Sequence, residues 1–428
     1  PEAISLCHRA GIRVFMVTGD HPFTGRAISE QIGLLDKSKK AIELLEGVTT
    51  EDSEWESCEG AVIHGSRIDG LTDDQWNLIL SKRAVCFART TPAHKLEIVR
   101  RCQDLGNIVA VTGDGVNDAP ALKQADVGIA MGLNGSDVAQ DSADLLLMDD
   151  NFASIVSGIE EGRLIFDNIK KTIAYTMAHI FPEVVSALIN LLAALPAGLT
   201  AMQVLTIDLG TEMGPAISMA YEKAESDIMD RPPRDPKKDR LVSPTLLVYS
   251  YIISGAMLSG GSIAAYILIY RQNGILMSDF YRPDISYDKG GFFSLTTSEP
   301  VTVERTGVTW SVADQKQLFS RAVTAFYIAL TVGQFCHVWV CKTRVNSLFT
   351  HGFANKFMFY GVAVGLFLAI FFAYVPGVQA FVGSYFVNWL PWVFALVNGA
   401  CLWIYNEGMK WYFRRAGPKS CLARWLAW

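Results

Sequence analysis

The sequence contains no low-complexity tract and no internal repeat, which excludes a disordered linker and a repeat array. Its 37 basic residues do not exceed its 43 acidic ones, so it lacks the basic excess of a nucleic-acid-binding chain and we expect no nucleic-acid partner. The eight cysteines lack the paired spacing of a metal site. We therefore expect them to be free thiols.

Hydrophobic residues make up 50% of the 428 residues, but they are distributed unevenly. Over 1–160, short apolar runs alternate with amphipathic stretches, which is typical of a soluble α/β domain with a parallel sheet. Over 161–428, long apolar runs approach the ~20 residues that a helix needs to cross ~30 Å of hydrocarbon. This second part predicts an all-α transmembrane domain of six helices in a lipid bilayer, at about 172–195, 198–220, 246–270, 320–341, 357–376 and 386–405.

Basic residues gather in the connections on one side of the predicted bundle. They are Lys170 and Lys171, the stretch 231–240 with Lys237 and Lys238, the stretch 342–344, and Arg414 and Arg415. Because such residues accumulate in cytoplasmic loops, we predict that this side is cytoplasmic. The connection 271–319 is then expected outside, and it contains no cysteine.

The stretch 110–122 is the most informative part of the chain. An apolar run precedes a tight acidic turn with Asp114, Asn117 and Asp118, and a helix pattern follows. Carboxylates in such a turn can hold Mg²⁺, while backbone N–H groups face a phosphate. An ordinary strand-to-helix turn is the alternative, because glycine, asparagine and aspartate are common in turns for backbone reasons alone.

Two further motifs follow apolar runs in the same way. Residues 14–17 lead into Thr18, Gly19, Asp20 and Thr24, in the pattern T-G-D-x-x-x-T. Residues 85–89 lead into a second turn and a helix that carries Lys95. A lysine ammonium can stabilise the charge that builds on a phosphoryl group, although a single helical lysine is usually a solvated cation.

In this order the three motifs resemble the phosphorylation domain of P-type ATPases, ion pumps of the haloacid dehalogenase-like superfamily. The resemblance implies a Rossmann-like parallel sheet that uses ATP and Mg²⁺. It assigns magnesium to Asp114 and Asp118, and phosphoryl-group contacts to the set Thr18, Gly19, Asp20, Lys95, Asn117 and Asp118. The phosphorylated aspartate of the D-K-T-G-T motif, the other soluble domains and the first four spans of the family are absent, so we expect a C-terminal part of a longer pump subunit.

Ionisable residues inside the predicted spans are the second informative feature, since they are costly there and mark functional sites. The first span carries His179 and Glu183, and Pro182 between them frees a backbone carbonyl one turn earlier. The second span carries Asp208 and Glu212, four residues apart and hence on one helical face. We expect an oxygen-rich cage for a hard cation, in a helix unwound near its glycines and proline. Residues near a water interface, or paired with each other, are the alternative.

The stretches 150–156, 163–171, 207–222 and 341–344 resemble the sodium/potassium and proton/potassium pump catalytic subunits. This resemblance covers most of the chain. It implies that Glu183, Asp208 and Glu212 bind the transported cation, sodium or potassium with protons as a further candidate, together with His179 and Gln334. It also implies a plasma-membrane location.

Departures from that group concern the ion. His179 stands where the sodium/potassium pump has a serine and the proton/potassium pump a lysine. A protonated histidine would act as a built-in cation, whereas a neutral one would bond to a neighbouring carbonyl, and the sequence leaves both open. His337 replaces an aspartate, the predicted fifth span has no acidic residue, and the end 424–428 lacks a tyrosine pair. We therefore do not expect a conventional exchange of three sodium for two potassium ions.

One possible partner and two alternative functions remain to be considered. The stretch 305–308 replaces the Ser-Tyr-Gly-Gln motif that binds a glycoprotein β subunit, so a β-type partner has little support. A phosphatase with a membrane anchor would explain the first third of the chain, but an anchor needs no carboxylates in its spans. A catalytically inactive membrane protein with an interaction role also fits, because the phosphorylated aspartate is absent.

Overall fold

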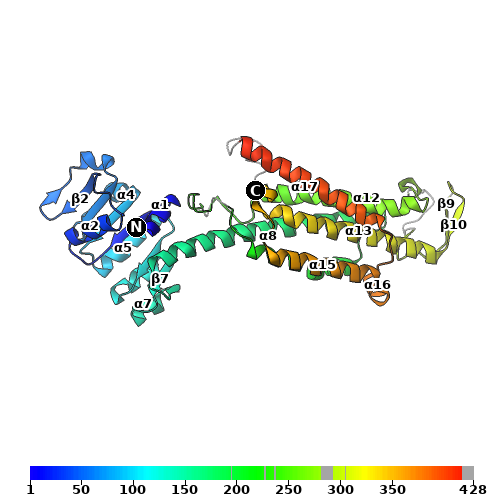
Figure 1. Ribbon diagram of the computed structural model, residues 1–428, viewed down its shortest axis with the longest axis horizontal. Helices are drawn as coiled ribbons and strands as arrows, with labels where there is room; N and C mark the ends of the chain where they lie inside the picture. Colours follow the sequence, from blue (N-terminus) through cyan, green and yellow to red (C-terminus); the bar gives the residue numbers. More distant parts are fainter. Residues whose placement is uncertain (194, 226–227, 236–237, 281–292, 304, 417–428) are drawn as a thin grey trace. The chain divides into compact units, whose positions relative to one another are not determined.

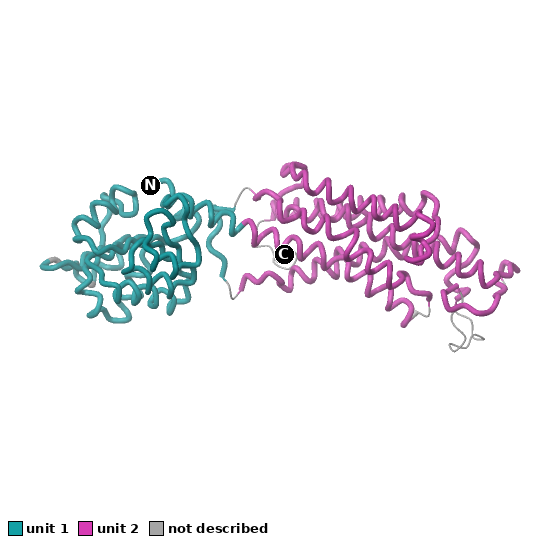
Figure 2. The backbone as a smooth tube through the Cα atoms, turned by 90° about the horizontal axis from the view of Figure 1, so that it is seen from below, with its two compact units in different colours: residues 1–163, 227–235 teal, residues 164–226, 236–428 magenta. Residues whose placement is uncertain are grey.

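The computed structural model describes residues 1–193, 195–225, 228–235, 238–280, 293–303 and 305–416. The chain forms two compact units, residues 1–163 with 227–235 and residues 164–226 with 236–428 (Figure 2). The segment 227–235 belongs to the first unit because the Arg163 guanidinium donates to the carbonyls of Ile228 and Arg231, at 3.0 and 2.9 Å, and to that of Ala10 at 2.9 Å. The sequence, divided at 160/161, did not indicate this return.

The first unit is an α/β domain, as predicted. One sheet has the order β1-β5-β4-β2-β3, from β1 (Val14–Val17), β5 (Ala84–Ala88), β4 (Gly60–His64), β2 (Ala41–Leu45) and β3 (Val48–Thr49). All its pairs are parallel except β2 with β3. A second, fully parallel sheet has the order β6 (Ala110–Gly113), β7 (Val127–Met131) and β8 (Leu145–Leu147). The helices are α1 (Glu2–Arg9), α2 (Pro22–Gln31), α3 (Gly65–Ile68), α4 (Asp73–Ser81), α5 (Pro92–Asp104), α6 (Ala119–Gln124) and α7 (Asp137–Ser142), with 3₁₀ turns η1 (Asp52–Ser57) and η2 (Val116–Asp118).

Burial differs sharply among these strands. Every residue of β5 is buried, as expected for a parallel strand covered on both faces. Its Phe87 packs in a core with Trp76 and Trp55. By contrast, all four residues of β1 are only partly buried, and β6 alternates between exposed and covered positions. Among the described strands, β1 pairs only with β5, and β6 pairs only with β7. Each of these strands therefore retains an unpaired edge.

The helix α8 (Phe152–Ala193) runs without a break for 42 residues and contains Pro182. The first predicted span, about 172–195, is therefore only the second part of a longer helix. Hydropathy marks where an apolar segment begins, whereas a helix continues as long as its backbone hydrogen bonds do. The polar residues before position 172 therefore belong to the same helix as the apolar ones.

The second unit is helical (Figure 1). After α8 come α9 (Ala201–Thr206), the π-helical η3 (Ile207–Thr211), α10 (Met213–Ser218), the 3₁₀ turn η4 (Met219–Tyr221), α11 (Pro244–Leu247), the π-helical η5 (Val248–Gly255), α12 (Ala256–Gln272), the 3₁₀ turn η6 (Met277–Phe280), the antiparallel strands β9 (Val301–Val303) and β10 (Val308–Trp310), α13 (Val312–Cys341), α14 (Leu348–His351), α15 (Lys356–Tyr374), α16 (Pro376–Val382) and α17 (Leu390–Ala416).

Four helical segments in the described part are long and apolar enough to cross a membrane: Phe152–Leu192, Pro244–Gln272, Val312–Cys341 and Lys356–Tyr374. Of the other two predicted spans, 198–220 corresponds to the short pieces α9, η3, α10 and η4, and 386–405 corresponds to α17. The structure is thus consistent with a multi-pass membrane protein, and the count of six stays a prediction. The seven described cysteines are free, as predicted. Lys237, Cys421 and the end 424–428 lie outside the described residues.

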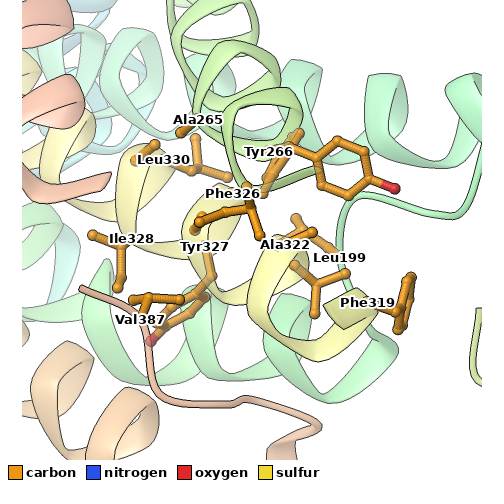
Figure 3. Packing of buried hydrophobic residues seen from close by; sticks show 14 of the residues in the cluster. Leu199, Ala265, Tyr266, Phe319, Ala322, Phe326, Tyr327, Ile328, Leu330 and Val387 are labelled. Atoms are coloured by element: carbon orange, nitrogen blue, oxygen red, sulfur yellow. The ribbon is translucent and has the colours of Figure 1, made fainter. Parts of the chain in front are cut away.

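The centre of the second unit is α13, which is buried along most of its length. It packs against α12 and α17 (Figure 1). Figure 3 shows its Phe326 and Leu330 among side chains from other helices, such as Tyr266 of α12. A helix that is apolar on all sides is typical of such an interior position.

A buried ionic cluster, centred on Glu222, joins several helix ends of this unit. The Glu222 carboxylate lies 3.0 Å from His351 Nε2 and 3.4 Å from Lys342 Nζ, and it accepts a hydrogen bond from Asn355 Nδ2 at 3.0 Å. Asn168 of α8 donates to the Glu222 carbonyl at 2.8 Å. Burial opposes ionisation of the Glu222 carboxyl, but the bonds from His351 and Asn355 and the charge of Lys342 hold its pKa below the usual value.

We expect Glu222→Gln to lower the free energy of unfolding by about 3–5 kcal/mol, because it leaves Lys342 buried without a counter-charge. Since the pKa of Glu222 is lowered in the folded state, its contribution is present above the ordinary carboxyl pKa and is lost as the pH falls through the lowered value. Denaturant unfolding in detergent at neutral and acidic pH measures both effects. The double variant Glu222→Gln/Lys342→Met removes both charges and should recover much of the loss. A single variant as stable as the double one would contradict the ionic role.

Candidate functional site

The three phosphate-type motifs all follow the carboxyl ends of parallel strands in the first unit. Thr18 comes directly after β1, Arg89 after β5 and Asp114 after β6. The first two motifs lie side by side, because the backbone N–H and the hydroxyl of Thr90 both donate to the Thr18 carbonyl, at 3.1 and 2.9 Å. The Arg89 N–H also donates to the Asp20 carbonyl at 2.9 Å. Ligands of α/β sheets bind at this kind of edge.

Lys95 connects the second motif to the third. It lies in the first turns of α5, which begins after the capping residue Thr91. Its Nζ is 2.5 Å from Oδ1 of Asp118, and both side chains are mostly buried. The other Asp118 oxygen accepts the Gly115 N–H at 3.3 Å. A Cβ on Gly113 would lie only 2.5 Å from the Asp118 Cβ, so glycine is required there for the acidic turn to fold back.

The donor set of the acidic turn fits Mg²⁺ through Asp114. Asp114 is exposed, and no hydrogen bond or ion pair of its carboxylate is found among the described residues. Hard carboxylate oxygens of this kind suit magnesium. Asp118 differs, because both its oxygens already contact Lys95 and Gly115. Its arrangement favours a role in positioning Lys95 and the turn, and its assignment as a magnesium ligand stays a prediction, as do the roles of Gly19 and Asn117, both exposed.

A second candidate site lies in the second unit, between α8 and η3. Tyr175, His179 and Glu183 are spaced four residues apart on α8 and so share one face. His179 Nε2 lies 3.0 Å from Oδ1 of Asp208, and the Tyr175 hydroxyl donates to Oε2 of Glu212. The partner of His179 is therefore a carboxylate and not the backbone carbonyl considered for a neutral histidine. The i, i+4 spacing of Tyr175 with His179 was a signal that could have found this tyrosine.

The helix that carries Asp208 is widened and not unwound as the sequence analysis expected. Residues Ile207–Thr211 form a π-helical turn, in which the Glu212 N–H donates to the Ile207 carbonyl at 3.0 Å. Such π turns are frequent at functional sites. The backbone remains hydrogen-bonded, as it must be in an apolar segment, while the wider turn changes the direction of the acidic side chains.

Several ligand atoms in this site have no partner. His179, Glu183 and Asp208 each offer a ligand atom, and these atoms lie within 4.8 Å of one another. Buried Oε1 atoms of Glu183 and Glu212 and the buried Nδ1 of His179 have no hydrogen bond. Unpaired carboxylate oxygens in an apolar interior are costly, so this donor set fits a cation. We name these four residues the acidic cluster.

The carbonyl freed by Pro182 is not placed in the acidic cluster. A proline at this position removes the bond to the Ala178 carbonyl. That oxygen lies against Gly255 of η5, where a Cβ would be 3.2 Å from it. Gly255 thus leaves room for the oxygen, which contacts the neighbouring helix.

Gln334 contacts His337 of its own helix, α13. It is fully buried, and its Oε1 lies 3.1 Å from Nδ1 of His337. The other His337 nitrogen lies 3.3 Å from the Tyr249 hydroxyl and 3.2 Å from Cys341 Sγ. In the described part of the chain no hydrogen bond joins Gln334 to Glu183, Asp208 or Glu212, although its Nε2 is buried and unpaired.

The chain belongs to the cation-transporting ATPases. The family described as "Cation transporting ATPase, C-terminus" matches residues 196–412, and the family described as "haloacid dehalogenase-like hydrolase" matches residues 1–126. Among curated relatives, a "Sodium/potassium-transporting ATPase subunit alpha" of Drosophila melanogaster is 41% identical over 97% of this chain. The alpha-3 subunit of Oreochromis mossambicus is 41% identical over 96%, and the alpha-4 subunit of Rattus norvegicus 41% identical over 97%. The resemblance to P-type ATPases of this group is thereby confirmed. The chain spans 40% of the length of each of these relatives.

Proposed function

We propose that this chain is the C-terminal part of an ATP-driven monovalent cation pump of the plasma membrane, of the sodium/potassium-exchanging type. Formation and hydrolysis of an aspartyl phosphate drive alternating exposure of the acidic cluster to the two sides of the membrane. The observation that carries the proposal is the acidic cluster itself, with its unpaired buried oxygens inside apolar helices. An anchor helix of a phosphatase has no use for such a group.

The phosphoryl chemistry is assigned to the edge where the three motifs meet. Thr18, Gly19 and Asp20 lie beside the phosphoryl group, Lys95 offsets its charge, and Asn117 steadies it. Bound Mg²⁺ supplies charge compensation, held by Asp114. The unpaired edges of β1 and β6 support the placement of the acceptor aspartate on a strand supplied by a further part of the protein, since open strand edges favour pairing. Most of the ATP site lies in that part as well.

The transported ions are proposed from the relatives. Sodium and potassium appear in the names of the relatives, and the acidic cluster offers the oxygen ligands that such cations take. A β-type partner has no support in the stretch 305–308, which replaces the expected motif.

Asp114→Asn in the longer gene product is expected to reduce Mg²⁺-dependent phosphoenzyme formation about 100-fold or more, because it removes a charge where charge must be offset. Acid-stable incorporation of ³²P from ATP measures the yield. Asp104→Asn, an exposed aspartate at the end of α5, is the matched control and should leave it unchanged. A normal yield in Asp114→Asn would defeat the assignment, and no yield in the unaltered protein would favour an inactive interaction protein.

Glu183→Gln, Asp208→Asn and Glu212→Gln are each expected to weaken cation activation of ATP turnover about tenfold, a loss of about 1.4 kcal/mol. Each change removes a carboxylate charge from the acidic cluster and leaves its shape nearly intact. ATP binding should persist, which separates this effect from unfolding. Glu161→Gln, an exposed position on the same helix α8, is the control. Wild-type cation activation in all three variants would remove the basis for the acidic cluster as the transport site.

A second candidate function is a pump with altered stoichiometry, and the contact between His179 and Asp208 favours it. A protonated His179 would form an ion pair with Asp208 and occupy part of the acidic cluster with a built-in charge. His337, which stands where the sodium/potassium pump has an aspartate, and the acid-free α15 point the same way, because both lack the carboxylates of a third sodium site. Fewer sodium ions per cycle, with protons as counter-ions, is the resulting proposal.

Charge movement per ATP in reconstituted vesicles tests this second function. Three-for-two exchange exports one net charge, whereas balanced exchange exports none. We expect no net current in the unaltered protein, a pH dependence near the histidine range, and a shift of that dependence in His179→Ser. His179→Lys keeps the positive charge and should remain electroneutral without the pH dependence. One charge per ATP, unaffected by His179→Ser, would falsify the proposal.

A further inference from the structure

A cavity of about 230 Å³ lies in the first unit, at the end of the five-stranded sheet opposite to the motifs that follow β1 and β5. Its floor includes Ala41, Gly60 and Ala84, the first residues of β2, β4 and β5. The motifs follow the last residues of their strands. Because β1, β5, β4 and β2 are parallel, the cavity and the motif edge are at opposite ends of the sheet. The walls come from α1, α2 and the segment that leads to β2.

The charged groups on these walls are mostly basic. The basic ones are His8, Arg26, Lys39, Lys40 and Arg83, and the acidic ones are Glu30, Asp36 and Glu59. Each acidic group already has a local partner: Glu30 lies 2.9 Å from Arg26 Nε, Glu59 lies 2.6 Å from Lys39 Nζ, and Asp36 accepts hydrogen bonds from Ser38. Lys40 Nζ also has an acidic partner, Glu54 at 3.4 Å, so Arg83 and His8 are the basic groups of the walls that lack one in the described part of the chain.

Two groups on the walls have no partner among the described residues. No ion pair or hydrogen bond is found for the Arg83 guanidinium, which is exposed toward solvent. The Nε2 atom of His8 is buried and has no hydrogen bond. Burial, and then the nearby charge of Arg83, lower the pKa of His8, which shows that the two side chains influence each other. In the described part of the chain, neither the Arg83 guanidinium nor the His8 Nε2 atom has an anionic group that accepts its hydrogen bond.

We propose that this cavity binds a small phosphate-type oxyanion, inorganic phosphate or a small phosphate monoester, through Arg83 and His8. The planar guanidinium presents parallel N–H donors that match two phosphate oxygens. His8 Nε2–H supplies a further donor to the same anion. The volume is below the ~300–1,000 Å³ of pockets for drug-sized ligands, so a nucleotide is too large. The site is separate from the motif edge in both position and residues.

Phosphate binding to the purified full chain in detergent, without Mg²⁺, tests the proposal. The measurements use a Lys95→Met background, which removes the lysine of the motif edge. In this background ³²P-phosphate is expected to bind in equilibrium dialysis, and Arg83→Gln should weaken the binding at least tenfold. Arg100→Gln, an exposed arginine of α5 that does not line the cavity, is the matched control and should bind as the background does. Since Arg83 is exposed, its replacement is not expected to prevent folding.

The ¹³Cε1 resonance of His8 gives a second readout that needs no change of this residue. Phosphate should raise its pKa, because a nearby anion favours the protonated ring, and Arg83→Gln should abolish the phosphate-induced change. Glycerol 3-phosphate and AMP are compared with inorganic phosphate to show which phosphate compounds the cavity accepts. Glycerol 3-phosphate, a small monoester, should bind, and AMP, a nucleotide, should not. Equal phosphate affinity in Arg83→Gln and Arg100→Gln, an unchanged His8 resonance, or stronger binding of AMP than of phosphate would each overturn the proposal.

Discussion

Carboxylates inside apolar helices are the constraint on which the second unit depends. An unpaired charge there is costly, so each acid must find a proton donor, a counter-charge or a cation. The structure meets this demand only in part. The Tyr175 hydroxyl donates to Glu212, and His179 contacts Asp208. One oxygen each of Glu183 and Glu212 has no hydrogen-bond partner among the described residues. Unpaired carboxylate oxygens do not stabilise an apolar bundle, whereas a bound cation would satisfy them.

Two departures from regular helix geometry, the π turn and the proline in α8, lie close in the sequence to these carboxylates. A regular helix satisfies every backbone group internally, which leaves nothing for a ligand. The π turn Ile207–Thr211 keeps the backbone bonded but alters the side-chain directions, and Pro182 releases a carbonyl that Gly255 accommodates. Both are local departures from regular geometry, and the π turn packs against α15 as well as its chain neighbours α9 and α10.

In the first unit the corresponding constraint is the turn after β6. Gly113 allows the turn to fold back onto Asp118, whose oxygens then bind Lys95 and Gly115. Asp118 thus orients the lysine, and Asp114 remains available. Two like acids four residues apart thus have different surroundings, because only Asp118 is contacted by a lysine. The basic cavity with Arg83 and His8 lies at the other sheet of the unit, where β2, β4 and β5 begin, so its residues and charge pattern differ from those of the acidic turn.

The sequence by itself determined the α/β class of the first part, the strands before each motif, the apolar helices and the candidate residues for the chemistry, because hydrophobic period and short motifs are local properties. Tertiary structure alone decided which of these residues meet. The contact of His179 with Asp208, the ion pair of Lys95 with Asp118 and the return of 227–235 to the first unit all join positions that are far apart in the sequence. Such contacts depend on how whole elements pack, and a local pattern holds no information about the side chains that another element brings.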